Sequence, residues 1–192
     1  MSNSSAVDIG LGQLILKRAE LTPGHRAITF EGHTRTFSKL AERVQRIASV
    51  LKQGGVCRGD RVGYIGLNHP VFLELLYACA CLGAIFVPLN FRLTGPEACF
   101  IVNDAGIHTL LADDALRPLI DQTRSDLCCR RYLSIESADQ QWQSLEPLLQ
   151  VAIPVMGSER VAADDVALIM YTSGTTGLPK GCLLYTSDAA DE

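Results

Sequence analysis

The segment Tyr171-Thr-Ser-Gly-Thr-Thr-Gly-Leu-Pro-Lys-Gly181 combines three glycines, four aliphatic hydroxyl groups and one lysine, directly after an apolar run typical of a strand. Glycine lets main-chain N–H groups approach a ligand without a Cβ in the way. Consecutive N–H groups in such a turn bind anions, and hydroxyl groups add donors to phosphate oxygens. Lys180 supplies a flexible positive charge for a phosphate. The composition therefore predicts a loop that binds the phosphates of a nucleoside triphosphate.

This loop differs from the common P-loop, in which Gly-Lys-Ser/Thr follows a first glycine after four residues. Here two residues separate Gly177 from Lys180, and Gly181 stands where the P-loop has a hydroxyl that binds Mg²⁺. The alternative is a flexible linker rich in serine, glycine and threonine. Pro179 stiffens the turn and an apolar strand precedes it, and both features favour the phosphate-binding interpretation.

The predicted phosphate contacts come from the hydroxyl groups, the first two glycines and the lysine of this segment. They are Thr172, Ser173, Gly174, Thr175, Thr176, Gly177 and Lys180. Lys180 is expected to face the β- and γ-phosphates, since such sites act by positioning and charge stabilisation. Some of the hydroxyl groups are expected only to stabilise the turn. No residue is assigned a catalytic or metal-binding role.

Strand-like and helix-like segments alternate over most of the chain. Expected strands cover residues 61–67, 84–89, 107–112, 129–135 and 166–171, and expected helices cover 8–19, 70–82, 96–104 and 113–123. Such alternation implies parallel strands joined by right-handed crossovers. Ligands of such sheets bind beyond the carboxyl ends of the strands, where Thr172 lies.

Near the N-terminus the pattern differs. Residues 27–30 and 34–37 predict a hairpin around Glu31-Gly32-His33, and Ser38 is the expected N-cap of a following helix that ends at Gly54-Gly55. Asn68 is the expected start signal of the helix at 70–82, and residues 137–158 are expected to be irregular. The predicted fold is therefore α/β, with a mostly parallel sheet flanked by helices and an N-terminal hairpin.

Charge and hydropathy exclude several classes of protein. The formal charge is −4 and no basic stripe is present, which argues against nucleic acid as a partner. The longest apolar stretch, residues 71–87, is interrupted by Glu74 and is short for a membrane span of about 20 residues. No transmembrane segment is therefore predicted.

Seven cysteines occur without a CxxC pair or a zinc-ligand spacing. Cys79, Cys81 and the pair Cys128-Cys129 lie in apolar surroundings and are expected to be buried thiols. The first residues show neither the cationic nor the apolar part of a secretory signal. We therefore expect a cytoplasmic protein with reduced thiols.

Two segments resemble the adenylate-forming superfamily, in its acyl- and aryl-CoA synthetase branch. The segment from Tyr171 to Gly181 is similar to the phosphate-loop signature of that family, and Leu82-Gly-Ala-Ile-Phe-Val-Pro-Leu-Asn-Phe-Arg-Leu-Thr94 resembles a core segment ahead of it. The resemblance runs from about Leu11 to Gly181. Residues 1–181 are therefore expected to be an incomplete N-terminal AMP-binding domain, because the family's substrate pocket, ribose-binding aspartate and C-terminal lysine have no counterpart here.

The last residues, Cys182-Leu-Leu-Tyr-Thr-Ser-Asp-Ala-Ala-Asp-Glu192, resemble a translated sequencing adapter. Residues 182–192 are therefore expected to be non-native and are left out of the fold prediction. The alternative is a genuine, divergent C-terminus.

The resemblance implies an ATP-dependent ligase that converts a small fatty, aryl or other carboxylic acid into an acyl-AMP and passes the acyl group to coenzyme A. ATP, Mg²⁺ and coenzyme A are the implied cofactors of the whole enzyme. Alternatives are a peptide-synthetase adenylation domain, another adenylate-former, or an inactive nucleotide-binding fragment. The acid and the oligomeric state are left open, and the 192-residue chain alone is not expected to complete adenylation.

Other polar residues receive structural interpretations. His69 is expected to be solvated or to cap a helix rather than to act in catalysis. The pair Asp164-Asp165 is expected to be a solvated loop pair rather than a metal site, since further acidic ligands are missing. Asn90, Arg92 and Thr94 are expected to brace the phosphate loop.

Overall fold

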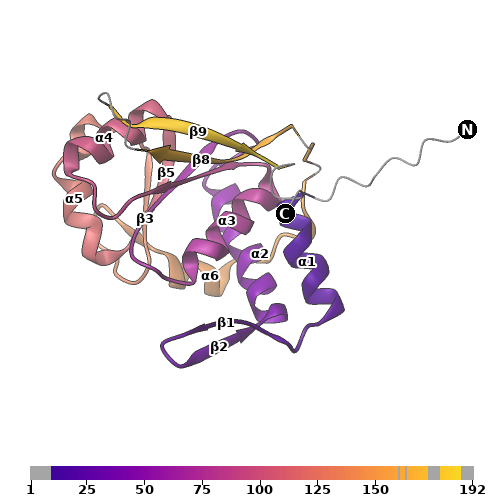
Figure 1. The fold of residues 1–192 in the computed structure, drawn as a ribbon. Helices are drawn as coiled ribbons and strands as arrows, with labels where there is room; N and C mark the ends of the chain where they lie inside the picture. Colours follow the sequence, from indigo (N-terminus) through magenta and orange to yellow (C-terminus); the bar gives the residue numbers. More distant parts are fainter. Residues whose placement is uncertain (1–9, 160, 163, 173–177, 187–192) are drawn as a thin grey trace, which may run out of the picture.

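The structure is a computed structural model that describes residues 10–159, 161–162, 164–172 and 178–186. Its centre is a seven-stranded sheet in the order β7-β6-β5-β3-β4-β8-β9 (Figure 1). Neighbouring strands are parallel except β8 and β9, which form an antiparallel pair. The strands are β3 (Arg61–Ile65), β4 (Ile85–Leu89), β5 (Ile107–Ala112), β6 (Arg131–Ser134), β7 (Gln143–Ser144), β8 (Val166–Thr172) and β9 (Lys180–Tyr185).

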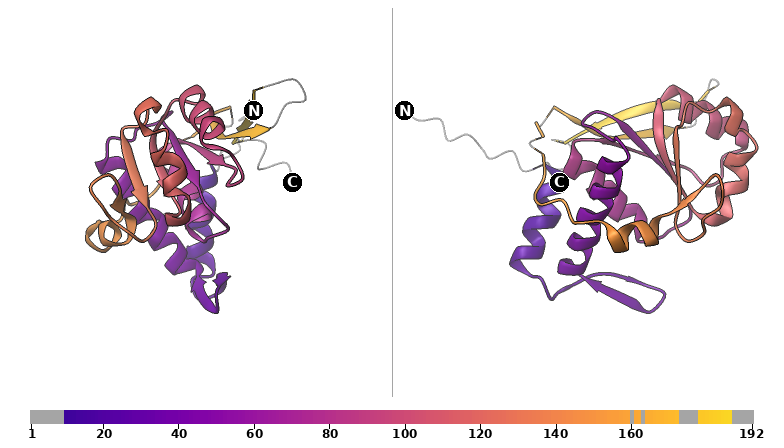
Figure 2. Two further views of the ribbon diagram at one scale, coloured as in Figure 1. Left: turned by 90° about the vertical axis from the view of Figure 1, so that its left-hand side faces the viewer. Right: turned by 180° about the vertical axis from the view of Figure 1, so that it is seen from behind.

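Helices cover both faces of this sheet, as the view from behind also shows (Figure 2). They are α1 (Leu11–Leu21), α2 (Phe37–Gln53), α3 (Val71–Leu82), α4 (Gly95–Asp104), α5 (Arg117–Asp121) and α6 (Leu145–Val151), with short 3₁₀ turns at Asp114–Leu116 and Arg124–Asp126. A separate hairpin of β1 (Arg26–Phe30) and β2 (His33–Thr36) extends beyond α1 and α2 (Figure 1). The predicted fold class is confirmed.

The core lies on the two faces of the central strands. Tyr64 and Phe86 pack with α2 and α3 on one face, while Ile65 and Val87 pack with α4 and α5 on the other. Successive side chains of a strand point to opposite faces, so strands covered on both sides need apolar residues at every position. This explains why these segments lack a clean alternation of polar and apolar residues.

Helix starts differ in detail from the sequence expectations. The N-cap of α2 is Thr36 rather than Ser38, because the Thr36 hydroxyl accepts a hydrogen bond from the Lys39 amide at 3.4 Å. Helix α3 is opened by Pro70 and His69 rather than Asn68, and Nδ1 of His69 accepts a hydrogen bond from the Val71 amide at 3.1 Å. The His69 side chain thus contacts the first turn of α3, as expected for one of its two interpretations, although the N-cap position itself is Pro70.

Proline divides the helix expected at 113–123 into a 3₁₀ turn and α5. Pro118 lacks an N–H group and so occupies the first turn of a new helix, where no intrahelical donor is needed. The strand expected at 129–135 covers only residues 131–134, and Cys128 ahead of it is exposed, so its expected burial is wrong.

The structure also contains elements where none were predicted. Residues 137–158 include β7 and α6, so the irregular segment expected there is wrong. Leu145 and Leu149 of α6 lie one turn apart and are both buried, and Pro147 lies in its first turn. Residues 182–185, left out of the prediction, form most of β9. The part of the helix expected at residues 8 and 9 lies outside the described residues.

Candidate phosphate-binding site

Strands β8 and β9 hold the two ends of the predicted phosphate loop. Thr172, the last residue of β8, is the direct cross-strand partner of Lys180, the first residue of β9. Residues paired in this way have Cβ atoms about 5 Å apart on one face of the sheet. Both side chains are exposed. A hydroxyl group and an ammonium group therefore leave the end of the hairpin on the same side.

Five of the seven predicted contact residues lie outside the described residues. They are Ser173, Gly174, Thr175, Thr176 and Gly177. The structure brings the other two, Thr172 and Lys180, together as cross-strand neighbours.

The hairpin ends at the carboxyl edge of the parallel strands. Phe86 of β4 is aligned with Leu168 of β8, so Asn90, four residues further on, is level with Thr172. Ile65 at the end of β3 is aligned with Leu89 and with Ala112 at the end of β5. The loops after these strands therefore share one edge with Thr172, which is where ligands of open α/β sheets bind.

Gly181 and Tyr171 form the next cross-strand pair of the hairpin. A Cβ on Gly181 would lie 3.2 Å from the Tyr171 ring and 3.1 Å from Ile169. Glycine therefore lets the tyrosine ring lie across the neighbouring strand. The third glycine of the motif, Gly181, is therefore needed for side-chain packing in the hairpin.

Tyr171 also links β8 to helix α4. Its hydroxyl donates a 2.6 Å hydrogen bond to Asp104, the last residue of that helix. Burial, and then this hydrogen bond, raise the pKa of the Tyr171 phenol above its usual value. Sequence reasoning missed this contact, since nothing in a single sequence joins two residues that are 67 positions apart.

The segment after β4 makes local contacts of its own. Oδ1 of Asn90 accepts a hydrogen bond from the Arg92 amide at 2.9 Å. Thr94 and Glu97 form a capping box at the start of α4, and the backbone and hydroxyl hydrogen bonds from Thr94 lower the pKa of Glu97. The Arg92 guanidinium lies 5.3 Å from the centre of the Phe91 ring. These contacts order the segment between β4 and α4. None of them reaches Thr172 or Lys180, so the bracing of the phosphate loop expected for this block stays a prediction.

The expectation that the acidic pair before β8 is solvated is wrong for Asp165, which makes structural contacts. Asp165 forms an ion pair with Arg58 and accepts a hydrogen bond from the Ala162 amide at 2.7 Å. The hydrogen bond from Arg58 lowers the pKa of Asp165. Asp164 is exposed. Among the described residues, no three His, Cys, Asp or Glu side chains lie together in a way that would hold a metal ion.

The comparison with protein families decides which family the chain belongs to. The profile described as AMP-binding enzyme matches residues 15–190, nearly the whole chain. The chain belongs to the AMP-binding enzyme family. The segment that carries the predicted phosphate loop lies inside the matched region.

Individual members of the AMP-binding enzyme family agree with this assignment. A feruloyl-CoA synthase from Amycolatopsis sp. is 40% identical over 175 residues, which are 91% of this chain and 33% of the relative. An indoleacetate–CoA ligase from Aromatoleum aromaticum is 39% identical over 175 residues, 91% of this chain and 34% of the relative. The chain thus spans about a third of the length of these relatives.

A solved structure supports the fold. The crystal structure of the anthranilate CoA ligase AuaEII in complex with anthranoyl-AMP matches 93% of this chain and 35% of that chain, with a TM-score of 0.90 and 23% identity. In the described part of the chain, no helix combines the length and the apolar character that crossing a bilayer requires.

Proposed function

We propose that this chain is the N-terminal, phosphate-binding part of an ATP-dependent, AMP-forming acid–CoA ligase. The observation that carries the proposal is the pairing of Thr172 with Lys180 at the carboxyl edge of the sheet, in a chain of the AMP-binding enzyme family. In the proposed reaction a substrate carboxylate attacks the α-phosphate of ATP and releases pyrophosphate. The thiolate of coenzyme A then attacks the acyl-AMP and releases AMP.

The described residues fit a polyphosphate. Lys180 is an exposed ammonium group that offers three donors and a full positive charge to the leaving pyrophosphate. The Thr172 hydroxyl, directly across the hairpin, can donate to a phosphate oxygen. Ser173, Gly174, Thr175, Thr176 and Gly177 complete the proposed cradle through their N–H and hydroxyl groups. Mg²⁺ would neutralise phosphate charge when bound, and no residue of this chain is assigned as its ligand.

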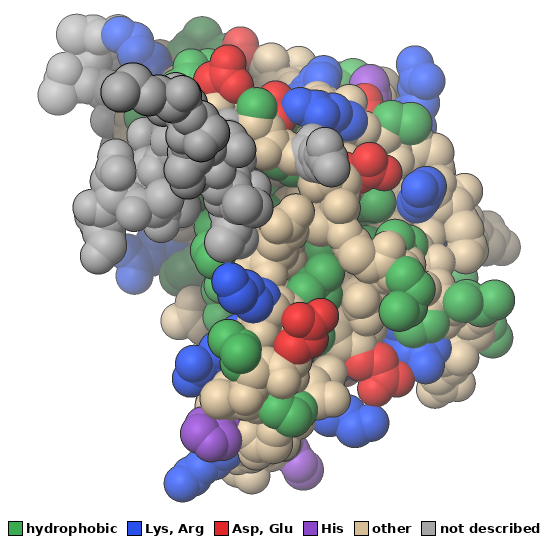
Figure 3. All heavy atoms as spheres, turned by 90° about the vertical axis from the view of Figure 1, so that its right-hand side faces the viewer, with side chains coloured by type: hydrophobic (Ala, Val, Ile, Leu, Met, Phe, Trp, Pro, Cys, Tyr) green, Lys and Arg blue, Asp and Glu red, His purple; other side chains and the backbone are tan. Residues whose placement is uncertain are grey.

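The proposed substrate is a small carboxylic acid. The two relatives described above are named for feruloyl-CoA and for indoleacetate, which favours an acid that carries an aromatic ring. The charge distribution argues against nucleic acid as a ligand, because Lys and Arg side chains are dispersed among apolar and acidic groups over the face shown in Figure 3. A cytoplasmic location is proposed because all seven cysteines are free thiols.

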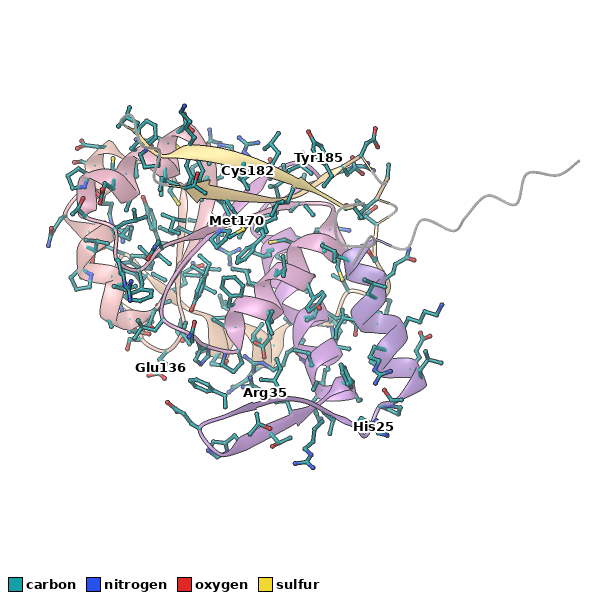
Figure 4. All side chains as sticks on the ribbon, viewed as in Figure 1. His25, Arg35, Glu136, Met170, Cys182 and Tyr185 are labelled. Atoms are coloured by element: carbon teal, nitrogen blue, oxygen red, sulfur yellow. The ribbon has the colours of Figure 1, made fainter. Side chains whose placement is uncertain are left out.

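We further propose, as a separate point, that residues 182–192 are not native. In the structure Cys182 is paired with Met170 and Tyr185 with Val166 in the β8–β9 hairpin (Figure 4). Such pairing uses backbone groups, which every residue other than proline supplies in full. Strand formation therefore does not depend on the origin of these residues. Sequencing of the gene from native DNA tests the point, and recovery of the same eleven codons followed by a stop would refute it.

The function is tested with a version of the protein extended to the length of its relatives. Lys180→Ala is expected to reduce ATP–pyrophosphate exchange by roughly 10²-fold, because it removes charge stabilisation of the leaving group. Thioester formation from supplied acyl-AMP is expected to change less than about threefold. Lys17→Ala, which removes an exposed lysine from α1, is the control.

Equal losses in the two half-reactions would contradict the proposed role of Lys180. The 192-residue chain itself is expected to show no turnover in the exchange assay. Robust exchange by this chain would contradict the proposal that it is only a part of the ligase.

A further inference from the structure

A polar cavity lies at the opposite edge of the sheet from the phosphate loop. It has a volume of about 340 Å³ and is lined by residues that precede or begin the parallel strands. Asp60 precedes β3, His108 lies at the start of β5, and Arg130 and Arg131 lie at the start of β6. Strands β3 and β5 are five and six residues long at about 3.3 Å per residue, so along these two strands the amino edge is roughly 17–20 Å from the carboxyl edge.

The cavity has an excess of positive charge. Arg130 and Arg131 face a single acidic lining residue, Asp60, whose carboxylate accepts a hydrogen bond from the Cys57 amide at 2.8 Å. In the part of the chain that the structure describes, neither arginine forms an ion pair with a carboxylate. His108 adds a further nitrogen donor.

Protein contacts hold the guanidinium of Arg131 in place without using all its donors. Nη1 donates to the Val50 carbonyl at 2.8 Å, and Nε donates to Oε1 of Gln143 at 3.2 Å. A guanidinium group has five N–H donors, so others remain for a ligand. Burial lowers the pKa of Arg131, and no acidic group offsets this effect. A half-buried cation without a counter-ion is destabilising, and a bound anion would relieve that cost.

The end of helix α2 makes room for this arrangement. A Cβ at Gly54 would overlap the Nη1 atom of Arg131, so only glycine permits the guanidinium to reach the Val50 carbonyl. Gly55 follows with a φ of +87°, which ends the helix beside the cavity. The donor is therefore positioned before any ligand binds.

We propose that this cavity is a binding site for a small phosphate group, either inorganic phosphate or the phosphate of a monoester. Two arginines that form no ion pair with a carboxylate in the described part of the chain match the charge of a phosphate, and planar guanidinium groups bind its oxygens in pairs. The site is separate from the loop between Thr172 and Lys180, and the inference does not depend on the proposed ligase activity.

The test uses the purified 192-residue chain and calorimetric titration with sodium phosphate, at an ionic strength held constant with chloride. Saturable binding in the range up to about 10 mM is expected. Arg130→Gln is expected to weaken it at least tenfold. Arg130 is exposed, and circular dichroism and thermal unfolding will check that this variant is folded. Arg131→Gln is expected to weaken binding by at least as much.

Two controls make the test specific. Arg26→Gln and Lys17→Ala remove exposed cations of the hairpin and of α1, and both are expected to leave phosphate affinity within twofold. Lys180→Ala removes the cation of the phosphate loop and shows whether the titrated phosphate binds there instead. Titration with phenyl phosphate distinguishes the two sources of the phosphate group. If phenyl phosphate binds more tightly than inorganic phosphate, the site is assigned to a monoester, and otherwise to inorganic phosphate. The proposal is overturned if no saturable binding occurs, if Arg130→Gln binds as the parent chain does, or if Lys180→Ala abolishes binding.

Discussion

The hydroxyl of Tyr171 donates a 2.6 Å hydrogen bond to the carboxylate of Asp104, which joins the last turn of α4 to the strand that carries the phosphate loop. Thr172 and the loop follow Tyr171 directly. The contact therefore anchors the end of β8 to α4. A carboxylate acceptor makes this hydrogen bond stronger than one between two neutral groups.

Removal of this hydrogen bond is expected to destabilise the chain slightly. Tyr171→Phe keeps the ring over Gly181 but leaves Asp104 without its phenol donor, and we expect a loss of about 0.5–1 kcal/mol in the free energy of unfolding, measured with urea. Tyr77→Phe is the control, because the described part of the structure shows no hydrogen bond from its hydroxyl. A loss in Tyr77→Phe as large as in Tyr171→Phe would show that the Asp104 contact contributes nothing.

The same contact predicts a dependence on pH. The pKa of Tyr171 is raised in the folded chain, so the neutral phenol is favoured by folding. The resulting stability is fully present below the unfolded-state pKa of about 10 and is lost as the pH rises through the folded-state pKa. Between pH 8 and pH 11 the parent chain is expected to lose more stability than Tyr171→Phe. If the free energy of unfolding fell equally with pH in the two proteins, the prediction would be contradicted.

Glu74 is expected to be one of the most sensitive positions of the fold. Its side chain is fully buried in α3, and Oε1 accepts hydrogen bonds from Arg35 and Arg43 at 2.9 Å each. Arg35 lies on the hairpin (Figure 4), so Glu74 ties β2 to α2 and α3. Glu74→Ala leaves the mostly buried Arg43 with only Glu146, and we expect a loss of about 3 kcal/mol in urea unfolding.

Glu42 provides the matched control for Glu74. It pairs with Lys39 and Arg46 on the exposed side of α2, and Glu42→Ala is expected to cost less than about 1 kcal/mol. If Glu42→Ala and Glu74→Ala lowered the free energy of unfolding by similar amounts, burial of the Glu74 ion pairs would not explain their contribution to stability.

Gly12 permits the close approach of α1 to α3. A Cβ at this position would lie 2.7 Å from the Cys81 amide nitrogen and 2.9 Å from the Ala80 carbonyl carbon. These are backbone atoms, so Gly12→Ala is expected to separate the helices and cost about 1–3 kcal/mol. Gly24→Ala meets no atom within 4 Å and is expected to change stability by less than about 0.5 kcal/mol. Thermal unfolding of both variants checks the difference, and an unchanged Tm for Gly12→Ala would contradict the packing argument.

Six of the seven cysteines are expected to fall into two classes of reactivity. Cys57, Cys128 and Cys182 are exposed, whereas Cys79, Cys81 and Cys129 are buried. Burial raises the pKa of Cys81 and of Cys129 to about 11, and that of Cys79 further, so few of these thiols are ionised near pH 8. Alkylation with iodoacetamide followed by mass spectrometry is expected to label the exposed class at least tenfold faster. In urea the unfolded chain is expected to show equal alkylation rates for all cysteines. Equal alkylation rates in the native chain would refute the assignment.

Several features of the fold follow from local sequence patterns. The strand at 107–112 has the predicted bounds, because an apolar run between Gly106 and Asp113 is a local signal. The hairpin around Glu31-Gly32 also formed as predicted, with both residues at positive φ. Errors arose where two local signals competed, as at Thr36 and Ser38, since both residues can cap a helix.

The sequence by itself determined the α/β class, the position of the phosphate-loop motif after an apolar strand, and the family to which the chain belongs. These are local properties, because motif chemistry and hydrophobic periodicity depend on neighbouring residues. Only the tertiary structure decided that Thr172 faces Lys180, that Asp104 receives the Tyr171 hydroxyl, and that Arg130 and Arg131 line a cavity without an ion-pair partner among the described residues. Such contacts depend on strand order and register, which arise from packing between segments far apart in the chain.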